Sequence, residues 1–336
     1  MSGTNINVER VSAQFHLMHR IRAFEECAIT ALNDGDVPGP LHPSIGQEAC
    51  AVAIVGSVNR DDILLSTHRG HGHTLVKGAS AQAMMCELLG KAGGCCGGKG
   101  GSMHIADFDV GMLGANGVVG ANLLIAAGAA HALDILGEAR IVVNIFGDGA
   151  INRGPFLEAL NWAQLYNLSV LFVCEDNRFS ATTRTADTTA GAGPVARAQA
   201  LGIPAISADG NDLLALEETA QSLIAQIRGG GGPRLLHAVT YRLTGHTAAD
   251  PASYRPAAEV AQKWNEDPLA RCAELLRGAG VQQRALDDVV TRARLEMEDA
   301  LAFARAAPYP GIEQAFSDIQ DLDWHTDPTL AAGVRA

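Results

Sequence analysis

The fold is decided by 140-RIVVNIFGDGAINRG-154 together with 169-SVLFVCEDN-177. Each stretch begins with a short, apolar, β-branched run, which predicts a buried strand. Between them, apolar side chains recur at helical spacing over residues 156–163. The sequence therefore predicts a strand, a helix and a second strand. Because a crossover helix joins them, the two strands should be parallel neighbours in one sheet.

Polar residues follow both predicted strands. Asp148 lies between Gly147 and Gly149, and Asn177 ends the second stretch. Both should lie at the carboxyl edge of the sheet, where such sheets hold ligands. With a backbone carbonyl such as that of Phe179, their oxygens form half of a cage for a hard divalent ion, and magnesium takes its other oxygens from water and phosphates. Gly-Asp-Gly alone is more typical of a tight turn, but the whole arrangement predicts a metal ion that clamps a diphosphate.

A cationic cluster, 67-THRGHGH-73, follows another predicted strand at residues 61–66. Arg69 is the strongest candidate for a diphosphate contact, because its guanidinium stays charged and can bond two oxygens. His68 and His71 can each donate one hydrogen bond. Zinc is an alternative ligand for this spacing of histidines, although the cluster lacks nearby cysteine or acidic partners.

Two further histidines are candidates for chemistry. His246 follows a predicted strand at residues 234–241, so it should share the sheet edge with Asp148 and could act as an acid, a base or a phosphate donor. His42 lies in a proline-rich loop and could contact a substrate. An exposed loop histidine is the ordinary alternative for both.

Glycine-rich segments suggest close approaches of the backbone to a ligand. The segment 93-GGCCGGKGGS-102 resembles a phosphate-binding P-loop, but Gly100 replaces the metal-binding Ser or Thr and a predicted helix at 81–91 precedes it. We therefore reject a P-loop and expect either a flexible loop near the mouth of the site or a plain connector. The segment 114-GANGVVG-120 could offer main-chain groups to a flat heterocycle or form a tight turn. Residues 180–194 predict a mobile segment.

Composition and charge limit the class of protein. The chain has 336 residues, 47% of them hydrophobic and 18% charged, enough for a large core. Its formal net charge of -12 argues against nucleic acid or an anionic membrane as a partner. The most apolar segment, residues 121–136, contains His131 and Asp134, so it predicts a buried helix rather than a membrane span.

The cysteines and the first residues predict a cytoplasmic protein. No hydrophobic run follows the polar first ten residues, so we expect no secretory signal. The seven cysteines follow no disulfide framework spacing, and the adjacent Cys95 and Cys96 could not bridge without strain. Reduced thiols in a cytoplasm are therefore expected.

Alternating strand and helix patterns predict an α/β fold: a mostly parallel sheet with helices on both faces, plus a C-terminal helical extension. A helical pattern at 8–34 precedes the sheet, and charged amphipathic patterns follow it. We expect a metal- and diphosphate-binding α/β domain at residues 1–256, including the N-terminal helix, and a helical extension at residues 257–336 with helices near 257–277 and 283–306.

The pattern GDGAINRG, with its flanking strands and Asn177, resembles the thiamine diphosphate motif. Further matches lie over about residues 10–310, in the family's order: PGPLHPSIGQEAC, STHRGHGH, GKGGSMHIAD, GMLGANGVVG, GDGAINRGPFLEALNWA and GHTAADPASYR. Together they resemble the α subunit of the two-chain, thiamine diphosphate-dependent E1 component of 2-oxo acid and acetoin dehydrogenase complexes. The resemblance implies the diphosphate-binding half of the thiamine diphosphate-binding fold.

The resemblance also implies roles for particular residues. It places Mg2+ on Asp148, Asn177 and the carbonyl of Phe179, and the diphosphate near Gly149, Ala150, His68, Arg69 and His246. It places the aminopyrimidine ring on the backbone of Gly117 and Val119, and it makes His42 and His246 the catalytic candidates near the substrate. The chain departs from relatives at His68, where tyrosine is frequent, at Asp176, where Asn is frequent, and at Ser180, where Gly or Ala is frequent.

The resemblance finally implies partners and a reaction. The glutamate that activates the cofactor would come from a separate β subunit, in an α2β2 heterotetramer, because no second sheet domain is found in this sequence. The acyl unit would pass to a lipoyl group on an E2 acyltransferase. The motifs are closest to the acetoin-cleaving branch, with pyruvate or another 2-oxo acid as the alternative substrate. A non-catalytic regulatory subunit that binds magnesium and a diphosphate is a further alternative.

Overall fold

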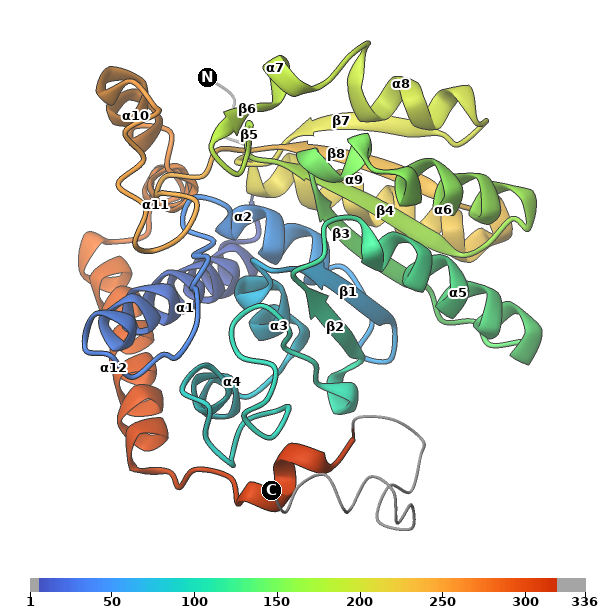
Figure 1. Cartoon of the computed structure of the whole chain (residues 1–336). Coiled ribbons are helices and arrows are strands. Elements are labelled where there is room, and N and C mark those ends of the chain that lie inside the picture. The colour runs from blue at the N-terminus through green and yellow to red at the C-terminus, as the bar shows by residue number, and fades with distance from the viewer. Residues whose placement is uncertain (1–5, 319–336) are drawn as a thin grey trace, which may run out of the picture.

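The computed structural model describes residues 6–318 of the chain and contains a six-stranded parallel sheet with helices on both faces (Figure 1). The strand order is β2-β1-β3-β4-β8-β7, and a short antiparallel hairpin lies apart from this sheet. The predicted α/β fold is confirmed. The strands are β1 Ile63–Thr67, β2 Met112–Asn116, β3 Val142–Gly147, β4 Val170–Asp176, β7 Ala205–Asp209 and β8 Arg234–Val239, and the hairpin is β5 Phe179–Ser180 with β6 Thr183–Arg184.

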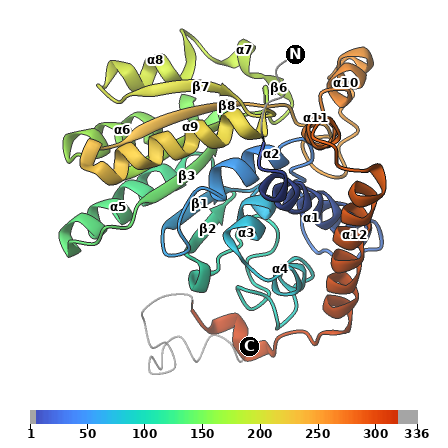
Figure 2. The ribbon, with the colours of Figure 1, turned by 180° about the vertical axis from the view of Figure 1, so that it is seen from behind.

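Alternate side chains of β3 support two cores, one on each face of the sheet. Val143 and Ile145 pack with the first group of helices, whereas Val142 and Phe146 pack with the second. The first group is α1 Val8–Asn33, α2 Glu48–Cys50, α3 His71–Lys77, α4 Ala81–Leu88, α9 Leu213–Gln226, α11 Pro268–Gly278 and α12 Gln283–Ala306; the second is α5 Ala121–Leu136, α6 Gly154–Leu165 and α8 Gly193–Ala200. Figure 2 views the molecule from behind, where helices of the first group, such as α1, α9 and α12, lie on the near side of the sheet.

Two local expectations were wrong. Residues 112–116 form the edge strand β2, which was not expected because glycine and polar residues obscure the alternation of apolar side chains there. Residues 257–277 were expected to form one helix, but α10 (Ala257–Trp264) ends before Pro268 and α11 starts at that proline. Asp267 caps α11 through the backbone N–H of Leu269, and a proline without an N–H is favoured at a helix start.

Helix α5 is only half buried, contrary to the expectation for residues 121–136. Its small side chains face the sheet, with Leu123 and Ala126 fully buried. Its opposite side leaves Leu124, Ile125 and Ile135 exposed to solvent. Because this apolar surface has no cover within residues 6–318, it is a candidate contact surface for another chain.

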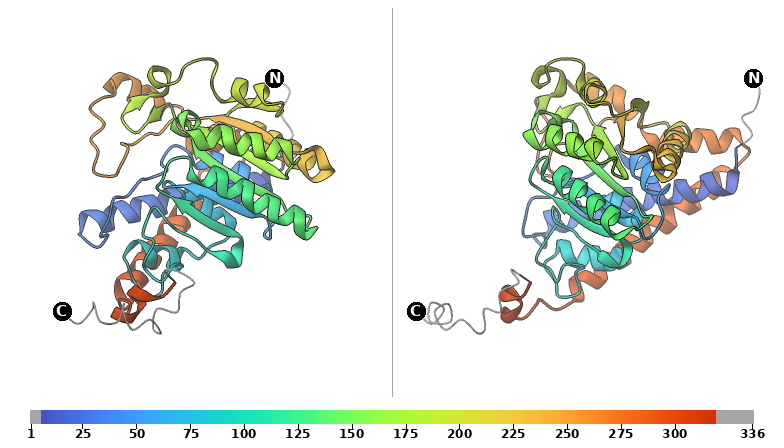
Figure 3. Two further views of the ribbon diagram at one scale, coloured as in Figure 1. Left: turned by 45° about the vertical axis from the view of Figure 1, so that its right-hand side comes forward. Right: turned by 90° about the vertical axis from the view of Figure 1, so that its right-hand side faces the viewer.

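The C-terminal helix packs on the N-terminal helix rather than standing apart. Figure 3 shows α12 beside α1, and Met297 and Leu301 join the same core as Phe15 and Met18. The proposed division at residue 256 stays a prediction, and residues 319–336 of the predicted extension lie outside the described residues. In residues 6–318, no helix is long and apolar enough to cross a membrane.

Candidate functional site

A cavity of about 230 Å³ lies at the carboxyl ends of β1, β3 and β4. Gly147 at the end of β3 pairs with Glu175 near the end of β4, so the polar residues that follow these strands come out side by side. The structure thus brings every predicted site residue to one cavity. Its lining includes His42, His68, Arg69, Gly117, Val119, Asp148, Gly149, Ala150, Asn177, Phe179 and His246.

One end of the cavity carries oxygen donors. The Asn177 side-chain nitrogen donates to Gln47 Oε1 at 3.0 Å, and the backbone N–H of Phe179 donates to Asn177 Oδ1 at 3.2 Å. Thr185 Oγ1 donates to Asp148 Oδ2. Burial, with a smaller contribution from the nearby Asp176 carboxylate, raises the pKa of Asp148 to about 6. A bound cation would offset the cost of keeping this buried carboxylate ionised, so this end of the cavity is suited to a hard metal ion.

Backbone geometry fixes this end. A Cβ atom at Gly149 would overlap the Ser180 hydroxyl, so a side chain at position 149 would have to displace Ser180 where the turn after β3 meets β5. Arg178 adopts a positive φ of 73°, which reverses the chain between Asn177 and the hairpin. Ser180 therefore packs directly against the turn that carries Asp148.

The other end of the cavity is cationic. The ring centroid of His42 lies 4.6 Å from that of His68 and 4.9 Å from that of His246. Arg69 is 3% exposed, and its guanidinium donates to the carbonyl oxygens of Pro43 and His246. No carboxylate pairs with Arg69 in the described part of the chain.

Burial and the neighbouring arginines keep the three histidines neutral. Burial first, and then the charge of Arg69, lowers the pKa of His42 to about 3, of His68 to about 2 and of His246 to about 4. Burial and the charge of Arg242 also lower the pKa of Arg69 to about 9, which leaves its guanidinium charged at neutral pH. The carboxylates of Glu25 and Glu175 act on Arg69 only through space, since neither forms an ion pair with it within residues 6–318.

Arg242 sets the hydrogen-bonding state of His246. Its guanidinium lies 3.4 Å from His246 Nδ1, which must accept because an arginine only donates. We assign the proton of the neutral imidazole to Nε2, which leaves an N–H donor. Asp250 Oδ2 accepts the backbone N–H of His246 at 2.6 Å and anchors the loop that carries this histidine.

His71, which the sequence offered with His68 as a possible hydrogen-bond donor, is absent from the lining of the cavity. His71 is fully buried, and its ring nitrogens lie 2.9 Å from Glu25 and 2.9 Å from Ser102. His73 bonds Ser66 at 2.8 Å instead of contributing to a cluster with His68. The His-x-His spacing thus serves packing beneath the cavity, not zinc binding.

A different histidine triplet, His42, His68 and His246, brings its ring nitrogens within 4.8 Å of one another. Such a triplet can hold a transition metal, but Arg69 and Arg242 lie beside it and already disfavour positive charge on the rings. The same charges attract an anion. The cluster is therefore better suited to phosphate oxygens than to a cation.

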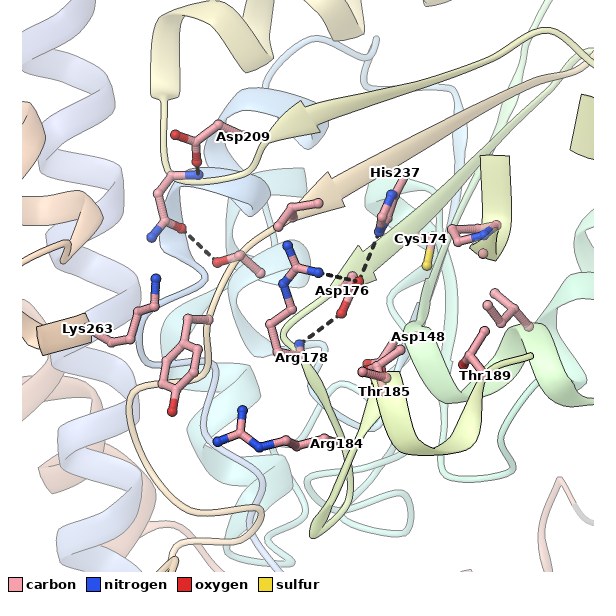
Figure 4. Close-up of a pocket in the computed structure, with 18 of the residues that line it drawn as sticks. Asp148, Cys174, Asp176, Arg178, Arg184, Thr185, Thr189, Asp209, His237 and Lys263 are labelled. Carbon is pink, nitrogen blue, oxygen red and sulfur yellow. Dashed lines mark hydrogen bonds and ion pairs between the residues drawn. The ribbon is translucent and has the colours of Figure 1, made fainter. Parts of the chain in front are cut away.

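A second cavity, of about 690 Å³, meets the first at Asp148 (Figure 4). Asp176 faces this second cavity, where it accepts hydrogen bonds from His237 Nε2 at 3.0 Å and from the backbone N–H of Arg178 at 2.8 Å. Aspartate at this position therefore removes no oxygen from the first cavity. Most of the other charged side chains that line the second cavity form ion pairs with one another, such as Arg184 with Glu259. The second cavity therefore offers no comparable set of unpaired charges to a ligand.

Three lining residues were missed by sequence reasoning. Arg242 lies four positions before His246 at the end of β8, Gln47 holds Asn177, and Met103 closes the side near Gly117. The first two lie within or beside quoted motifs, so a signal existed. Met103 also lies within a quoted motif, GKGGSMHIAD, but its place in the lining depends on how the glycine-rich segment folds.

Residues 16–313 match the family described as dehydrogenase E1 component. The chain belongs to this family. It is 41% identical over 316 residues to the α subunit of acetoin:2,6-dichlorophenolindophenol oxidoreductase of Cupriavidus necator, which covers 94% of this chain and 95% of that protein. The corresponding α subunit of Bacillus subtilis is 37% identical, with the same coverage of 94% and 95%.

A further member of the dehydrogenase E1 family is more distant. The somatic, mitochondrial pyruvate dehydrogenase E1 α subunit of Homo sapiens is 34% identical over 312 residues, which covers 92% of this chain and 79% of that protein. The expected membership in the thiamine diphosphate-dependent E1 family is confirmed, and it supports an oxidoreductase role. The individual roles of the cavity residues stay predictions.

Proposed function

We propose that this chain is the α subunit of an acetoin-cleaving, thiamine diphosphate-dependent E1 component that passes an acyl unit to a lipoyl group. The observation that carries the proposal is one cavity with buried oxygen donors at one end and, at the other, buried arginines that form no ion pair within residues 6–318. A ligand that combines a cation with an anion suits both ends. The overall similarity to the acetoin-type α subunits favours acetoin over pyruvate or another 2-oxo acid.

The cationic end would hold the diphosphate. Arg69 donates from a buried position, and His246 presents its Nε2–H beside it. His68 lines the same space and offers one more donor. Charge-assisted hydrogen bonds from a desolvated arginine are among the strongest that phosphate oxygens receive in proteins. This end would therefore bind the diphosphate oxygens directly.

The oxygen end would hold Mg2+. Asp148, the Asn177 side chain and the carbonyl of Phe179 make a set of hard ligands, which suits magnesium and leaves positions for diphosphate oxygens. Gln47 orients the Asn177 amide so that its oxygen stays on the cavity side. Thr185 must release Asp148 Oδ2 for that oxygen to reach a metal ion.

The aminopyrimidine ring of the cofactor would lie near Gly117, and the substrate would lie near His42. Backbone groups at Gly117 and Val119 line the cavity and can hold a flat ring. Bound thiamine diphosphate supplies an electron sink for breaking a bond next to a carbonyl. The Nδ1 atom of His42 is buried without a hydrogen-bond partner, so it is available to a substrate or cofactor oxygen.

A β subunit would cover the mouth of this cavity. Val118 is 63% exposed and Val119 is 47% exposed at the rim, and the apolar surface continues along α5 through Leu124 and Ile125. A continuous apolar surface at the edge of a catalytic cavity favours a permanent partner. We assign it to the β subunit of an α2β2 heterotetramer, placed in the cytoplasm, with the lipoyl-bearing E2 protein approaching the completed site.

The test is turnover by the reconstituted α and β pair. Acetoin or pyruvate is supplied with thiamine diphosphate, Mg2+ and an artificial electron acceptor, and the Asp148→Ala pair serves as the inactive control. Faster reduction of the acceptor with acetoin supports the proposal, and faster reduction with pyruvate replaces its substrate. Tight cofactor binding without turnover on either substrate would instead favour a regulatory subunit.

A further inference from the structure

The glycine-rich segment after α4 encloses a carboxylate of its own chain. Glu87 is fully buried, and its Oε2 accepts the backbone N–H groups of Cys96 at 2.8 Å and Gly98 at 2.9 Å. Its Oε1 accepts those of Gly100 at 2.7 Å and Gly101 at 3.1 Å. These four N–H groups are therefore unavailable to an external phosphate. The segment is an ordered wrap around Glu87, and its two thiols sit on this wrap.

Cys95 and Cys96 differ from the other cysteines in exposure. All seven are free thiols, and five of them are buried, whereas these two are only half-buried. Their sulfur atoms and a Glu87 carboxylate oxygen lie within 4.8 Å of one another. Two thiols that lie this close and reach solvent can react with the same reagent.

Glu87 is a poor metal ligand despite its proximity. A carboxylate has about four lone-pair positions, and four backbone N–H groups already bond its oxygens. A zinc ion at the two sulfurs would need to break these bonds or to lack a third protein ligand. The arrangement therefore favours chemistry that involves only the two sulfurs.

The two thiols are not equivalent. Cys96 Sγ accepts the backbone N–H of Ala106 at 3.1 Å, which stabilises a thiolate. A hydrogen bond from the Cys95 thiol, and then the Ala106 bond, lowers the pKa of Cys96. The same thiol–thiol hydrogen bond, together with burial, raises the pKa of Cys95. Cys96 is thus the nucleophile of the pair, and Cys95 is the thiol that can react with it afterwards.

Cys96 is connected to the wall of the cofactor cavity. Besides accepting the Ala106 N–H, the Cys96 thiol can donate to the carbonyl oxygens of Ala106 at 3.4 Å and His104 at 3.6 Å. The His104 ring and Met103 sulfur pack so tightly on Gly117 that an added Cβ there would lie 3.3 Å and 3.6 Å from them. Met103 itself lines the cavity. A change at the Cys96 sulfur therefore displaces the chain that supports the predicted ring-binding backbone.

We propose that hydroperoxides oxidise Cys95 and Cys96 to a disulfide, and that this disulfide weakens cofactor binding. The Cys96 thiolate attacks hydrogen peroxide, forms a sulfenic acid and releases hydroxide. The Cys95 sulfur then attacks the Cys96 sulfur, forms the S–S bond and releases water, with its proton taken up by the leaving oxygen. Peroxide is reduced by two electrons and the thiol pair is oxidised by two.

Adjacency makes this bridge reversible. Neighbouring Cα atoms lie about 3.8 Å apart, closer than the about 4.4–6.8 Å that disulfides usually span. Bridging Cys95 and Cys96 therefore strains the chain and makes the bond easy to reduce. The strain also pulls the Cys96 backbone N–H away from Glu87 and the Cys96 sulfur away from Ala106. The coupling of this site to the cofactor rests on the proposed function, whereas the thiol chemistry does not.

The first experiment tests the thiol chemistry on the full chain in complex with its β subunit. The complex is treated with hydrogen peroxide and then alkylated, and its peptides are analysed by mass spectrometry. We expect the peptide with both cysteines to lose two hydrogen atoms, Cys95→Ser to retain a sulfenic acid trapped by dimedone at Cys96, and Cys96→Ser to be unreactive. A Cys272→Ser variant, altered at a buried thiol, should behave like the wild type. Equal reactivity of Cys96→Ser and wild type, or a bridge to Cys86, would overturn the proposal.

The second experiment tests the coupling. Calorimetric titration with thiamine diphosphate and Mg2+ should show about tenfold weaker binding to the oxidised complex, equivalent to about 1.4 kcal/mol, with recovery after dithiothreitol. A Cys95→Ala/Cys96→Ala double variant should bind equally before and after peroxide. Oxidation without any change in affinity would overturn the coupling but leave the oxidation site standing. If neither the reduced nor the oxidised complex bound the cofactor, only the proposed function would be contradicted, because mass spectrometry of the thiols needs no cofactor.

Discussion

The two ends of the cavity face opposite electrostatic problems. At the oxygen end, burial raises the pKa of Asp148 to about 6, and no cationic side chain in the described part of the chain forms an ion pair with this carboxylate. At the cationic end, Arg69 and Arg242 form no ion pair within residues 6–318, and they help keep His246 neutral. Hydrogen bonds within the protein reach both ends, from Thr185 to Asp148 and from Arg69 to two carbonyl oxygens, but neither end forms an ion pair among the described residues. On the proposed function, the cation and the diphosphate of one ligand would neutralise the two ends together.

The largest expected effect is at the oxygen end, with Asp148→Ala. Removing the only charged predicted metal ligand should weaken Mg2+-dependent retention of thiamine diphosphate by at least about a hundredfold, since even second-shell changes cost about 10–100-fold. Equilibrium dialysis with and without Mg2+ measures the loss. Binding of the diphosphate without Mg2+ should change little, because Arg69 at the other end is untouched.

Asp176→Asn is the matched control for that substitution. Asp176 is the last residue of β4 and lies near Asp148, but its carboxylate accepts hydrogen bonds from His237 and from the backbone N–H of Arg178 in the second cavity. We expect Mg2+-dependent retention within about threefold of the wild type, since no cavity oxygen is lost. An equal loss in both variants would show that general disruption, rather than metal ligation, caused the effect of Asp148→Ala.

The cationic end should respond to Arg69→Lys. A lysine keeps the charge but cannot bond two phosphate oxygens while also holding the carbonyls of Pro43 and His246. Affinity for thiamine diphosphate should fall by about 10–100-fold, corresponding to the loss of about 1.5–3 kcal/mol of charged hydrogen bonding. The response to Mg2+ should survive, unlike in Asp148→Ala. A variant that binds the cofactor normally would remove Arg69 from the diphosphate site.

Sequence reasoning located this site because parallel strands end at a common edge. Asp148 and Asn177 follow strands that were recognisable from β-branched apolar runs, so their meeting could be predicted. Arg69 and His246 were found for the same reason, since each follows a sheet strand. These residues depend on local pattern and topology alone.

Other features were not predictable because they depend on tertiary packing. His71 belongs to the same glycine-containing cluster as His68, yet its ring is fully buried against Glu25, 46 positions earlier in the chain. The four amides around Glu87 likewise follow from a fold of the glycine-rich segment that no periodicity encodes. The outward apolar side of α5 looked buried because composition does not show which face meets the sheet.

Acid should affect the two ends in opposite directions. Below about pH 6, Asp148 is protonated, so Mg2+ must displace a proton and its affinity should fall by up to about tenfold per pH unit. An anion bound at the other end should raise the lowered pKa of His246, so that His246 takes up a proton when the anion binds. The affinity for the anion should therefore rise as pH falls. Calorimetry from pH 7.5 to 5 with MgCl2 or sulfate, each alone, separates the two. Affinities that move in the same direction would contradict the contrast.

The same histidines predict an acid-dependent loss of stability. Their pKa values in the folded chain lie below the ordinary 6.5, so the unfolded chain binds protons first as pH falls. Stability should be highest above about pH 6.5 and should fall toward pH 4, with the largest contribution from His68, because solvent screens the more exposed His42 and His246. Urea unfolding at pH 7 and pH 5 measures the difference. Sulfate should reduce it, whereas a sulfate-independent slope would place the responsible groups elsewhere.

The smallest expected effect is that of His68→Tyr, which separates charge from hydrogen bonding at the cationic end. A tyrosine hydroxyl can donate to a phosphate oxygen as the imidazole does, so thiamine diphosphate affinity at pH 7.5 should change by less than about threefold. Tyrosine does not titrate between pH 5 and pH 7.5, so proton uptake on sulfate binding should decrease, measured by calorimetry in buffers of different ionisation enthalpy. His68→Ala, which removes the donor as well, is the comparison. If tyrosine and alanine weaken binding equally, His68 contributes no hydrogen bond, and the cationic end depends on Arg69 and His246 alone.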